Sequence, residues 1–308
     1  MLILRGLNSP DSRPIALTIG NFDGVHMGHQ ALLRELRMEA QARGLQTGVV
    51  IFEPHPRELF TPQQAPVRLT SLREKLELFA SLGTDRVHVC RFNRQFAKMS
   101  AAEFISALHQ RLSAKFVLIG DDFRFGSERG GDFALMEKIG EQLGFSVRSV
   151  HTVSLDGVRI SSTAVRASLA AGQLRTAQGY LGRHYSISGR VVHGDGVGRE
   201  LGFPTANIQL KHNRPPLSGI FVVQAHAEGL GVLQGVASLG VRPTLKSDAK
   251  PVLEVHLFEF SQRIYGKHLR VQFLQKLRDE EKYPDVETLT RHIALDVENA
   301  KKWFEQHD

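Results

Sequence analysis

The sequence predicts two domains, a doubly wound α/β domain followed by a small antiparallel β-barrel with a C-terminal helix. Through the first half, strand-like and helix-like segments alternate, which is typical of a parallel sheet covered on both faces. After residue 182, strand-like segments follow one another without helices, as in an antiparallel sheet or barrel. A chain of 308 residues is also long for one domain. We therefore expect an N-terminal domain over 1–182 and a C-terminal domain over 183–308.

The individual elements follow from the spacing of apolar residues. A short apolar strand over 14–17 precedes a helix that ends near Arg43. Further strands are expected at 47–52, 86–90, 116–119 and 145–150, and helices at 71–82, 101–112 and 133–143. Two short helical pieces over 169–181 lead to strands at 185–192, 219–227, 233–239, 253–260 and 269–274 and to a helix over 286–304. A capping box, Ser100 to Glu103, opens the helix over 101–112.

The composition favours a soluble protein with small anionic partners. The net charge is +7 and the isoelectric point is about 9.7, yet no dense run of Lys and Arg occurs. We therefore expect phosphorylated small molecules as partners rather than nucleic acid. Cys90 is the single cysteine, so an internal disulfide and a cysteine-based zinc site are excluded. We expect a cytoplasmic protein without a signal peptide or membrane partner, and the sequence leaves open whether it forms a weak homo-oligomer.

The most informative segment covers residues 18–30, where a strand, a glycine-bearing turn and a helix start follow one another. Gly20 and Gly28 allow the backbone to approach a ligand closely, and amides at a helix start favour an anion. His26 and His29 are three residues apart, so both rings can face the same space. The segment matches neither a Walker loop nor a dinucleotide fingerprint. His-x-Gly-His is instead the phosphate-handling signature of nucleotidyltransferases, with simple packing or surface histidines as the alternative.

Further polar segments fall at strand ends of the same predicted sheet. Residues 53–56 and 120–126 follow two of the predicted strands, where ligands of parallel sheets bind. In the segment 159–166, two arginines flank three hydroxyl residues at a helix start, which suits a phosphate group. Helix capping alone is the alternative for these hydroxyl groups.

The second domain has a glycine-rich loop of its own, at 194–207. Pro204 excludes the helix of a dinucleotide fingerprint. A flexible loop beside Thr205 and Asn207 suits a nucleotide and its Mg²⁺, which takes oxygen ligands and few of them from protein. A hairpin without a ligand is the alternative.

Glu254 lies on the polar face of a strand whose other face is apolar. In a small barrel, one face lines the interior and the other meets solvent or a covering helix. A solvated strand carboxylate is therefore the alternative to a functional one.

Together these motifs resemble the bifunctional prokaryotic FAD synthetases, in which a riboflavin kinase is joined to an FMN adenylyltransferase. The resemblance covers essentially the whole chain, in the family's domain order. It rests on the segments 20–29, 52–56, 120–126, 160–166, 201–207, 219–221 and 253–256.

The resemblance implies that the protein phosphorylates riboflavin with ATP and then transfers the adenylyl group of ATP to FMN. It implies that His26 and His29 stabilise charge on the ATP phosphates and that Glu254 accepts the riboflavin hydroxyl proton. Thr205 and Asn207 match the motif that holds Mg²⁺ and nucleotide phosphate. The nucleotide- and flavin-binding residues it implies are Gly20, Asp23, Gly28, Asp122, Arg159, Ser161, Ser162, Thr163, Arg166, Gly196, Gly198, Thr205 and Asn207.

Two rival functions remain at this point. A nucleic-acid-binding protein would account for the basic isoelectric point, and it would bind DNA or RNA in a salt-dependent way. A single-activity adenylyltransferase with a regulatory barrel would fail to convert riboflavin into FMN.

Overall fold

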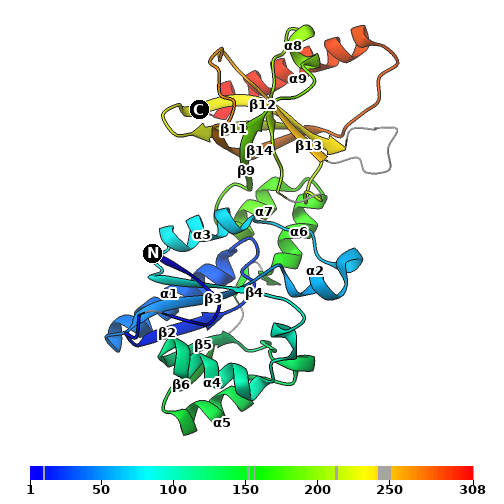
Figure 1. The fold of residues 1–308 in the computed structure, drawn as a ribbon. Helices are drawn as coiled ribbons and strands as arrows, with labels where there is room; N and C mark the ends of the chain where they lie inside the picture. The colour runs from blue at the N-terminus through cyan, green and yellow to red at the C-terminus, as the bar shows by residue number, and fades with distance from the viewer. Residues whose placement is uncertain (10, 151–152, 156, 212–213, 242–250, 308) are drawn as a thin grey trace. The chain divides into compact units, whose positions relative to one another are not determined.

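The computed structural model describes residues 1–307 apart from 10, 151–152, 156, 212–213 and 242–250 (Figure 1). The chain forms two compact units. The first comprises Met1–Pro66 and Leu72–Ser162, and the second comprises Val67–Ser71 and Thr163–Asp308.

The first unit is built on a six-stranded sheet in which every neighbouring pair is parallel. Its order is β1-β4-β3-β2-β5-β6. The strands are β1 (Leu2–Arg5), β2 (Ile15–Ile19), β3 (Gln46–Glu53), β4 (Arg86–Arg91), β5 (Ala114–Gly120) and β6 (Ser146–Val150). The central strand β2 is buried along its whole length, as expected for a sheet covered on both faces. The predicted doubly wound sheet is confirmed.

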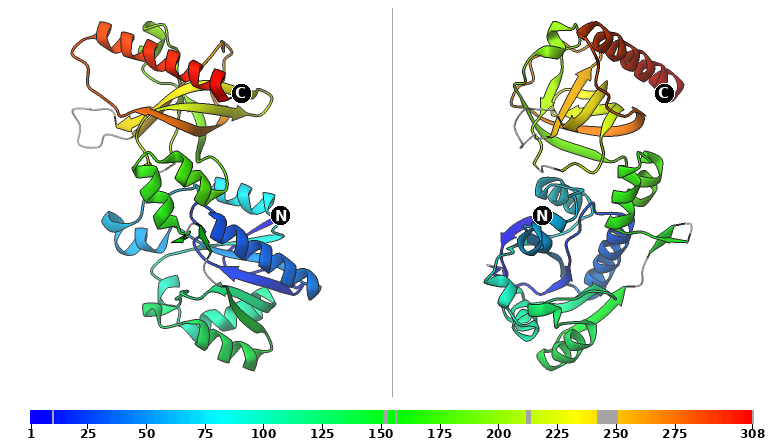
Figure 2. Two further views of the ribbon diagram at one scale, coloured as in Figure 1. Left: turned by 180° about the vertical axis from the view of Figure 1, so that it is seen from behind. Right: turned by 90° about the vertical axis from the view of Figure 1, so that its right-hand side faces the viewer.

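Helices cover both faces of this sheet (Figures 1 and 2). Helices α1 (Met27–Ala42) and α3 (Leu72–Ser81) pack on one face, and α4 (Ala101–Leu112) and α5 (Phe133–Leu143) pack on the other. Alternation along β2 divides its side chains accordingly, with Ile15 and Leu17 toward α4 and Ala16 toward α1. The predicted capping box of α4 is confirmed, since the Ser100 hydroxyl accepts a hydrogen bond from the backbone amide of Glu103. Smaller elements of this unit are α2 (Pro56–Phe60), η1 (Pro62–Gln64), η2 (Phe96–Lys98), η3 (Ser127–Arg129), β7 (Ser154–Leu155) and β8 (Val158–Arg159).

The second unit contains a closed antiparallel barrel in the order β10-β13-β12-β11-β14-β9. Its strands are β9 (Ser186–Val192), β10 (Ala206–Ile208), β11 (Gly219–Ala227), β12 (Gly231–Val241), β13 (Pro251–Leu257) and β14 (His268–Arg278), and a short helix, α8 (Val197–Glu200), lies in the glycine-rich loop. The C-terminal helix α9 (Val286–His307) packs Ala300 and Phe304 against Val222 and Val236 on the outside of the barrel. The predicted barrel and C-terminal helix are confirmed.

Two further helices, α6 (Ser162–Ala170) and α7 (Leu174–Leu181), share the core of the barrel. Leu169 and Leu181 belong to the same buried cluster as Phe221 and Phe273 of the strands. The two compact units therefore divide after Ser162, whereas the change of pattern in the sequence lies near residue 182. The difference arises because these helices bury their apolar faces against the strands that follow them.

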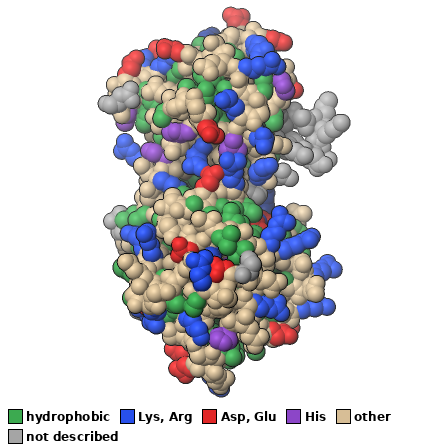
Figure 3. Space-filling view, turned by 60° about the vertical axis from the view of Figure 1, so that its left-hand side comes forward, with side chains coloured by type: hydrophobic (Ala, Val, Ile, Leu, Met, Phe, Trp, Pro, Cys, Tyr) green, Lys and Arg blue, Asp and Glu red, His purple; other side chains and the backbone are tan. Residues whose placement is uncertain are grey.

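Charged side chains of both signs lie on each unit. On the face drawn in Figure 3, Lys and Arg side chains are interspersed with Asp and Glu. Within the residues that the structure describes, no helix is both long enough and apolar enough to cross a bilayer.

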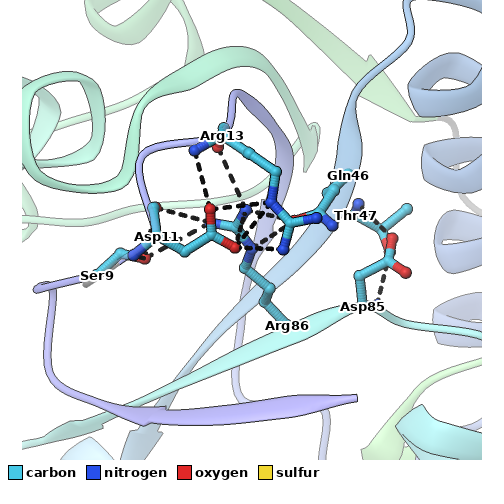
Figure 4. Close-up of polar contacts among 7 residues, drawn as sticks. All are labelled: Ser9, Asp11, Arg13, Gln46, Thr47, Asp85 and Arg86. Carbon is cyan, nitrogen blue, oxygen red and sulfur yellow. Dashed lines mark hydrogen bonds and ion pairs between the residues drawn. The ribbon is translucent and has the colours of Figure 1, made fainter.

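A polar network anchors the loop between β1 and β2 at the amino ends of the parallel strands (Figure 4). At its centre, Arg86 is only 1% exposed. Its Nη2 lies 2.8 Å from Oδ2 of Asp11, and its Nε donates to the Gln46 side chain at 2.7 Å. Arg86 also donates to the backbone carbonyls of Asp11 and Arg13. These bonds satisfy a buried cation at the edge of the sheet opposite to the carboxyl ends, so we assign the network to stability.

Candidate active sites

The two histidines meet at the start of α1, just beyond the carboxyl end of β2. The imidazole of His26 caps the helix, because its Nδ1 accepts the backbone amide of His29 at 3.4 Å. The two rings stack with their centroids 3.6 Å apart and their planes 17° apart. A Cβ on Gly28 would lie 3.2 Å from Nδ1 of His26, so the glycine makes room for this ring. The rings share one space, as their spacing predicts.

The loop before these histidines has a constrained backbone. Phe22 has φ +49° and Val25 has φ +41°, on either side of Gly24 at φ +81°. Left-handed backbone at residues other than glycine costs about 1–3 kcal/mol each and persists only where the surroundings enforce it. Phe22 and Val25 are 2% and 0% exposed, so core packing enforces it here. The loop therefore holds its histidines in a fixed position.

Electrostatics favour the neutral form of His29. Burial of the ring lowers its pKa well below the ordinary value, and the positive charges of His26 and Lys75 lower it further. Nζ of Lys75 lies 3.1 Å from Oε1 of Glu53, at the end of β3. Among the described residues, Nδ1 of His29 and Oδ1 of Asn21 are buried without a hydrogen-bond partner. The hydrogen-bonding capacity of both atoms is therefore unused within the described part of the chain.

The sequence analysis does not identify Lys75 and Asn21 as site residues. A signal for Lys75 exists in the sequence, because it falls between Leu72 and Phe79 on the apolar stripe of α3, where a charge is out of place. Asn21 has no such signal, since a polar residue in a turn is ordinary.

A second segment, around Arg159, lies against the histidine loop. The Ser162 hydroxyl donates to the backbone carbonyl of Asp23 at 2.9 Å, and the Ile160 carbonyl lies 3.6 Å from the position of a Cβ on Gly28. Nη2 of Arg159 lies 2.7 Å from Oδ2 of Asp122, with side chains 55% and 67% exposed. Exposed ion pairs are worth about 0–1 kcal/mol, so a phosphate group can compete for Arg159 at small cost.

Other predicted residues of this region have simpler surroundings. A Cβ on Gly20 would lie 3.0 Å from the Phe22 ring, which explains the small residue there. Ser161 is half-buried directly before α6, and Thr163 is exposed in its first turn. Nε of Arg166 donates to the Val67 carbonyl at 2.6 Å within the second unit. The phosphate contacts expected of these residues stay predictions.

The second unit contains a cavity of about 920 Å³ on the outside of its barrel. The wall comes from strands β11, β12 and β13, from the glycine-rich loop, and from the segment that joins β14 to α9. Its polar lining includes Thr205, Ser238, Glu254, His256 and Glu280, and its apolar lining includes Ile220, Val236, Val252 and Leu289. A ligand with an apolar body and polar groups fits such a lining.

Strand register places three polar residues in a row beside this cavity. Glu254 of β13 lies directly opposite Asn207 of β10 and Ser238 of β12. Residues that face one another in neighbouring antiparallel strands point to the same side, with Cβ atoms about 5 Å apart. Leu253 and Val255 on either side point into the barrel core. Glu254 therefore borders the cavity and not the barrel interior.

The glycine-rich loop lies directly over Thr205 and Asn207. A Cβ on Gly194 would overlap the side-chain amide of Asn207, and one on Gly198 would lie 3.3 Å from Oγ1 of Thr205. Gly196 adopts φ +81° ahead of the short helix α8, a conformation that suits glycine. Within the described part of the chain, no cluster of three or more His, Cys, Asp or Glu side chains could hold a metal.

The sequence analysis also does not identify Ser238 and Glu280. The Ser238 hydroxyl donates to Oε1 of Glu280 at 3.2 Å. The Glu280 carboxylate lies so close to Gly240 that a Cβ there would overlap it. Strand pairing sets Ser238 opposite Glu254, and Glu280, just after β14, reaches the Ser238 hydroxyl and lines the same cavity, so no local pattern could reveal these residues.

A parallel-sheet unit with stacked histidines at a helix start, joined to a barrel with a glycine loop beside a cavity, defines a two-part enzyme that handles nucleotide phosphates. The family model of FAD synthetase matches residues 8–164, and that of riboflavin kinase matches residues 181–304. The chain belongs to the family of bifunctional riboflavin kinase/FMN adenylyltransferases.

Full-length relatives carry that description. The protein of Escherichia coli K12 is 46% identical over 99% of this chain and 98% of its own length. The protein of Haemophilus influenzae is 44% identical over 99% of both chains. A crystal structure titled as a macrolide-efflux protein of Streptococcus pneumoniae has a TM-score of 0.82 and 27% identity, over 98% of this chain and all of that one. That structure shares the whole fold, while its title says nothing about catalysis.

Proposed function

We propose that the second unit phosphorylates riboflavin to FMN with ATP, and that the first unit then transfers an adenylyl group from ATP to FMN. The two activities are those of the family, and the proposal assigns one to each unit. The observation that supports it most directly is the stacked pair His26 and His29 at a helix start. This arrangement suits a triphosphate, because both a helix N-terminus and imidazole N–H groups favour anions.

In adenylyl transfer, a phosphate oxygen of FMN attacks the α-phosphorus of ATP. The bond from the α-phosphorus to the bridging oxygen breaks, and pyrophosphate leaves with the electron pair. The nucleophile is already ionised, so this site needs positioning and charge stabilisation rather than a base. A neutral His29 donates one N–H to a phosphate oxygen, and Arg159 exchanges Asp122 for the triphosphate. Gly20, Asp23 and Gly28 keep the backbone close to the ligand, while Ser161, Ser162, Thr163 and Arg166 complete the phosphate site.

In riboflavin phosphorylation, the nucleophile is an alcohol and a base is needed. The carboxylate of Glu254 accepts the proton of the riboflavin 5′ hydroxyl as the hydroxyl oxygen attacks the γ-phosphorus of ATP. The bond from the γ-phosphorus to the bridging oxygen breaks, and ADP leaves with the electron pair. General-base assistance is worth about 10²- to 10⁴-fold in rate. The cavity beside Glu254 has an apolar wall suited to the flavin ring. The loop containing Gly196 and Gly198 covers the phosphates.

Enzymes of these two families use a divalent metal, and we propose Mg²⁺ for the kinase site. Thr205 and Asn207 would hold it through their side-chain oxygens, and Asn207 is kept in place beneath Gly194. Two neutral oxygen donors fit Mg²⁺, which takes its other ligands from water and phosphate. When bound, the ion neutralises phosphate charge. We place the enzyme in the cytoplasm, with ATP, riboflavin and FMN as its partners and no nucleic acid.

Product analysis by chromatography tests the assignment of the two sites. With riboflavin, ATP and Mg²⁺, the parent is expected to form FMN and then FAD, and His29→Ala is expected to accumulate FMN. His109→Ala, in the last turn of α4, is the matched control and should still form FAD. Undiminished FAD output from His29→Ala would refute the role of the first site.

A further inference from the structure

A buried lysine lies on α3, the helix that packs beside the loop of the histidine pair. Lys75 of α3 is 1% exposed, which makes it one of the largest fully buried side chains in the described chain. An ammonium group is costly to bury and persists in a core where a partner and a function retain it. Its partner is Glu53, with 3.1 Å between Nζ and Oε1. The ion pair joins α3 to the carboxyl end of β3, the edge where ligands of parallel sheets bind.

Packing brings this lysine to the side of His29. Lys75 and Phe79 are four residues apart and lie on one face of α3. The Phe79 and Phe22 rings pack edge-on with their centroids 5.4 Å apart, and the centroids of the Phe22 and His29 rings are 4.9 Å apart. The chain of contacts Phe79–Phe22–His29 therefore fixes the distance of α3 from the histidine. Lys75 is consequently held on the same face of α3 as Phe79, near enough for its charge to act on the His29 ring.

We propose that Lys75 is a positioning residue for adenylyl transfer, which acts through His29 and is itself held by Glu53. This inference rests on the proposed role of His29. The charge of Lys75 disfavours a second positive charge on His29, so the ring stays neutral and offers a single N–H to phosphate. The same cation adds positive potential to the wall that a triphosphate approaches.

Several charged groups surround the ring and bear on this inference. The positive charges that act on it come from Lys75 of α3 and from His26 at the cap of α1. Carboxylates on the same elements include Glu53 at the end of β3, the buried Glu74 of α3 and Asp23 in the loop before α1. Removal of the Lys75 charge must raise the pKa of His29, because one of the two groups that disfavour the imidazolium is lost.

The test compares Lys75→Met with Lys75→Arg in the full-length enzyme. Methionine keeps much of the length without charge, whereas arginine keeps the charge. We expect Lys75→Met to lower kcat of FAD formation from FMN and ATP by about 10- to 100-fold, because small displacements of a catalytic group have effects of this size. Lys75→Arg should restore most of the rate. Riboflavin phosphorylation, which needs only the second unit, should stay at the parent's level in both.

An NMR titration with labelled histidine supplies the readout that a merely structural role would not change. The pKa of His29 should rise in Lys75→Met and stay low in Lys75→Arg. Glu53→Gln should lower FAD formation as well, since it frees the lysine. The exposed Lys138 of α5 provides the matched control, Lys138→Met, with no effect on either reaction.

The outcomes separate this inference from the proposed function. An inactive His29→Ala together with a fully active Lys75→Met would overturn the role of Lys75 alone. An active His29→Ala would overturn the role of His29 and the inference with it. If Lys75→Met loses FAD formation but Lys75→Arg is equally impaired and the His29 titration is unchanged, Lys75 only stabilises the fold and the inference is wrong.

Discussion

The proposed role of Glu254 in riboflavin phosphorylation gives a prediction that one substitution can test. Glu254→Gln keeps the size of the side chain and one acceptor oxygen, and it removes only the basic group. Because Glu254 borders the cavity in register with Asn207 and Ser238, the substitution leaves the strand pairing intact. Loss of a general base lowers the rate by about 10²- to 10⁴-fold, which corresponds to about 3 to 5 kcal/mol in the barrier. Glu280 also lines the cavity, and its carboxylate can partly replace the missing base. We therefore expect the loss of kinase rate to lie near the lower end of this range, at about 10²-fold, if Glu280 takes over.

The assay is the initial rate of FMN formation from riboflavin, ATP and Mg²⁺, followed by chromatography. The same variant supplied with FMN should form FAD at the parent's rate, because none of the residues proposed for adenylyl transfer lies in the barrel strands. Glu228→Gln is the matched control, since Glu228 is an exposed carboxylate at the turn after β11 of the same barrel. Its two rates should equal those of the parent.

The outcome that refutes the reasoning is specific. A Glu254→Gln variant with a kinase rate within about threefold of the parent would show that Glu254 is a solvated strand carboxylate and that the phosphorylation of riboflavin uses another base. A fall of both rates together with a lower melting temperature would instead point to lost stability. The double variant with Glu280→Gln then tells whether the second carboxylate supplies the residual rate.

Three further predictions concern the stability of the fold, the modularity of the two units and the rate of FAD formation. Hydrogen bonds from Arg13, with help from Arg86, hold the pKa of Asp11 well below its ordinary value of 3.8, so its ionised form stabilises the fold above that value and this contribution declines as the pH falls toward the lowered pKa. Asp11→Asn should therefore lower the melting temperature at pH 7. An equal difference in melting temperature between parent and variant at pH 3 would contradict this. A fragment over 163–308 should melt cooperatively and phosphorylate riboflavin, and it should be more stable than one over 183–308, because α6 and α7 share the barrel core; equal melting temperatures would refute this. Ser162→Ala should lower FAD formation about fivefold without changing the kinase rate, because its hydrogen bond of about 1 kcal/mol holds the histidine loop against the phosphate segment. An unchanged rate of FAD formation would show that this bond is dispensable.

The local content of the sequence determined most of the architecture. Alternating strand and helix patterns predicted the parallel sheet, and consecutive strands predicted the barrel, because hydrophobic periodicity is a local consequence of which face is buried. The spacing of His26 and His29 predicted two rings in one space, which is likewise a property of one helix start. The capping box at Ser100 is likewise a local feature of one helix start.

Tertiary structure alone decided which distant residues meet. Lys75 pairs with Glu53, 22 residues away, because α3 packs over the end of β3. The row of Asn207, Glu254 and Ser238 depends on the register of three strands, and a slip by one residue would turn each side chain to the other face. The assignment of α6 and α7 to the barrel unit depends on where their apolar faces find a core. Such pairings are set by the packing of whole elements, whose energies no short stretch of sequence contains.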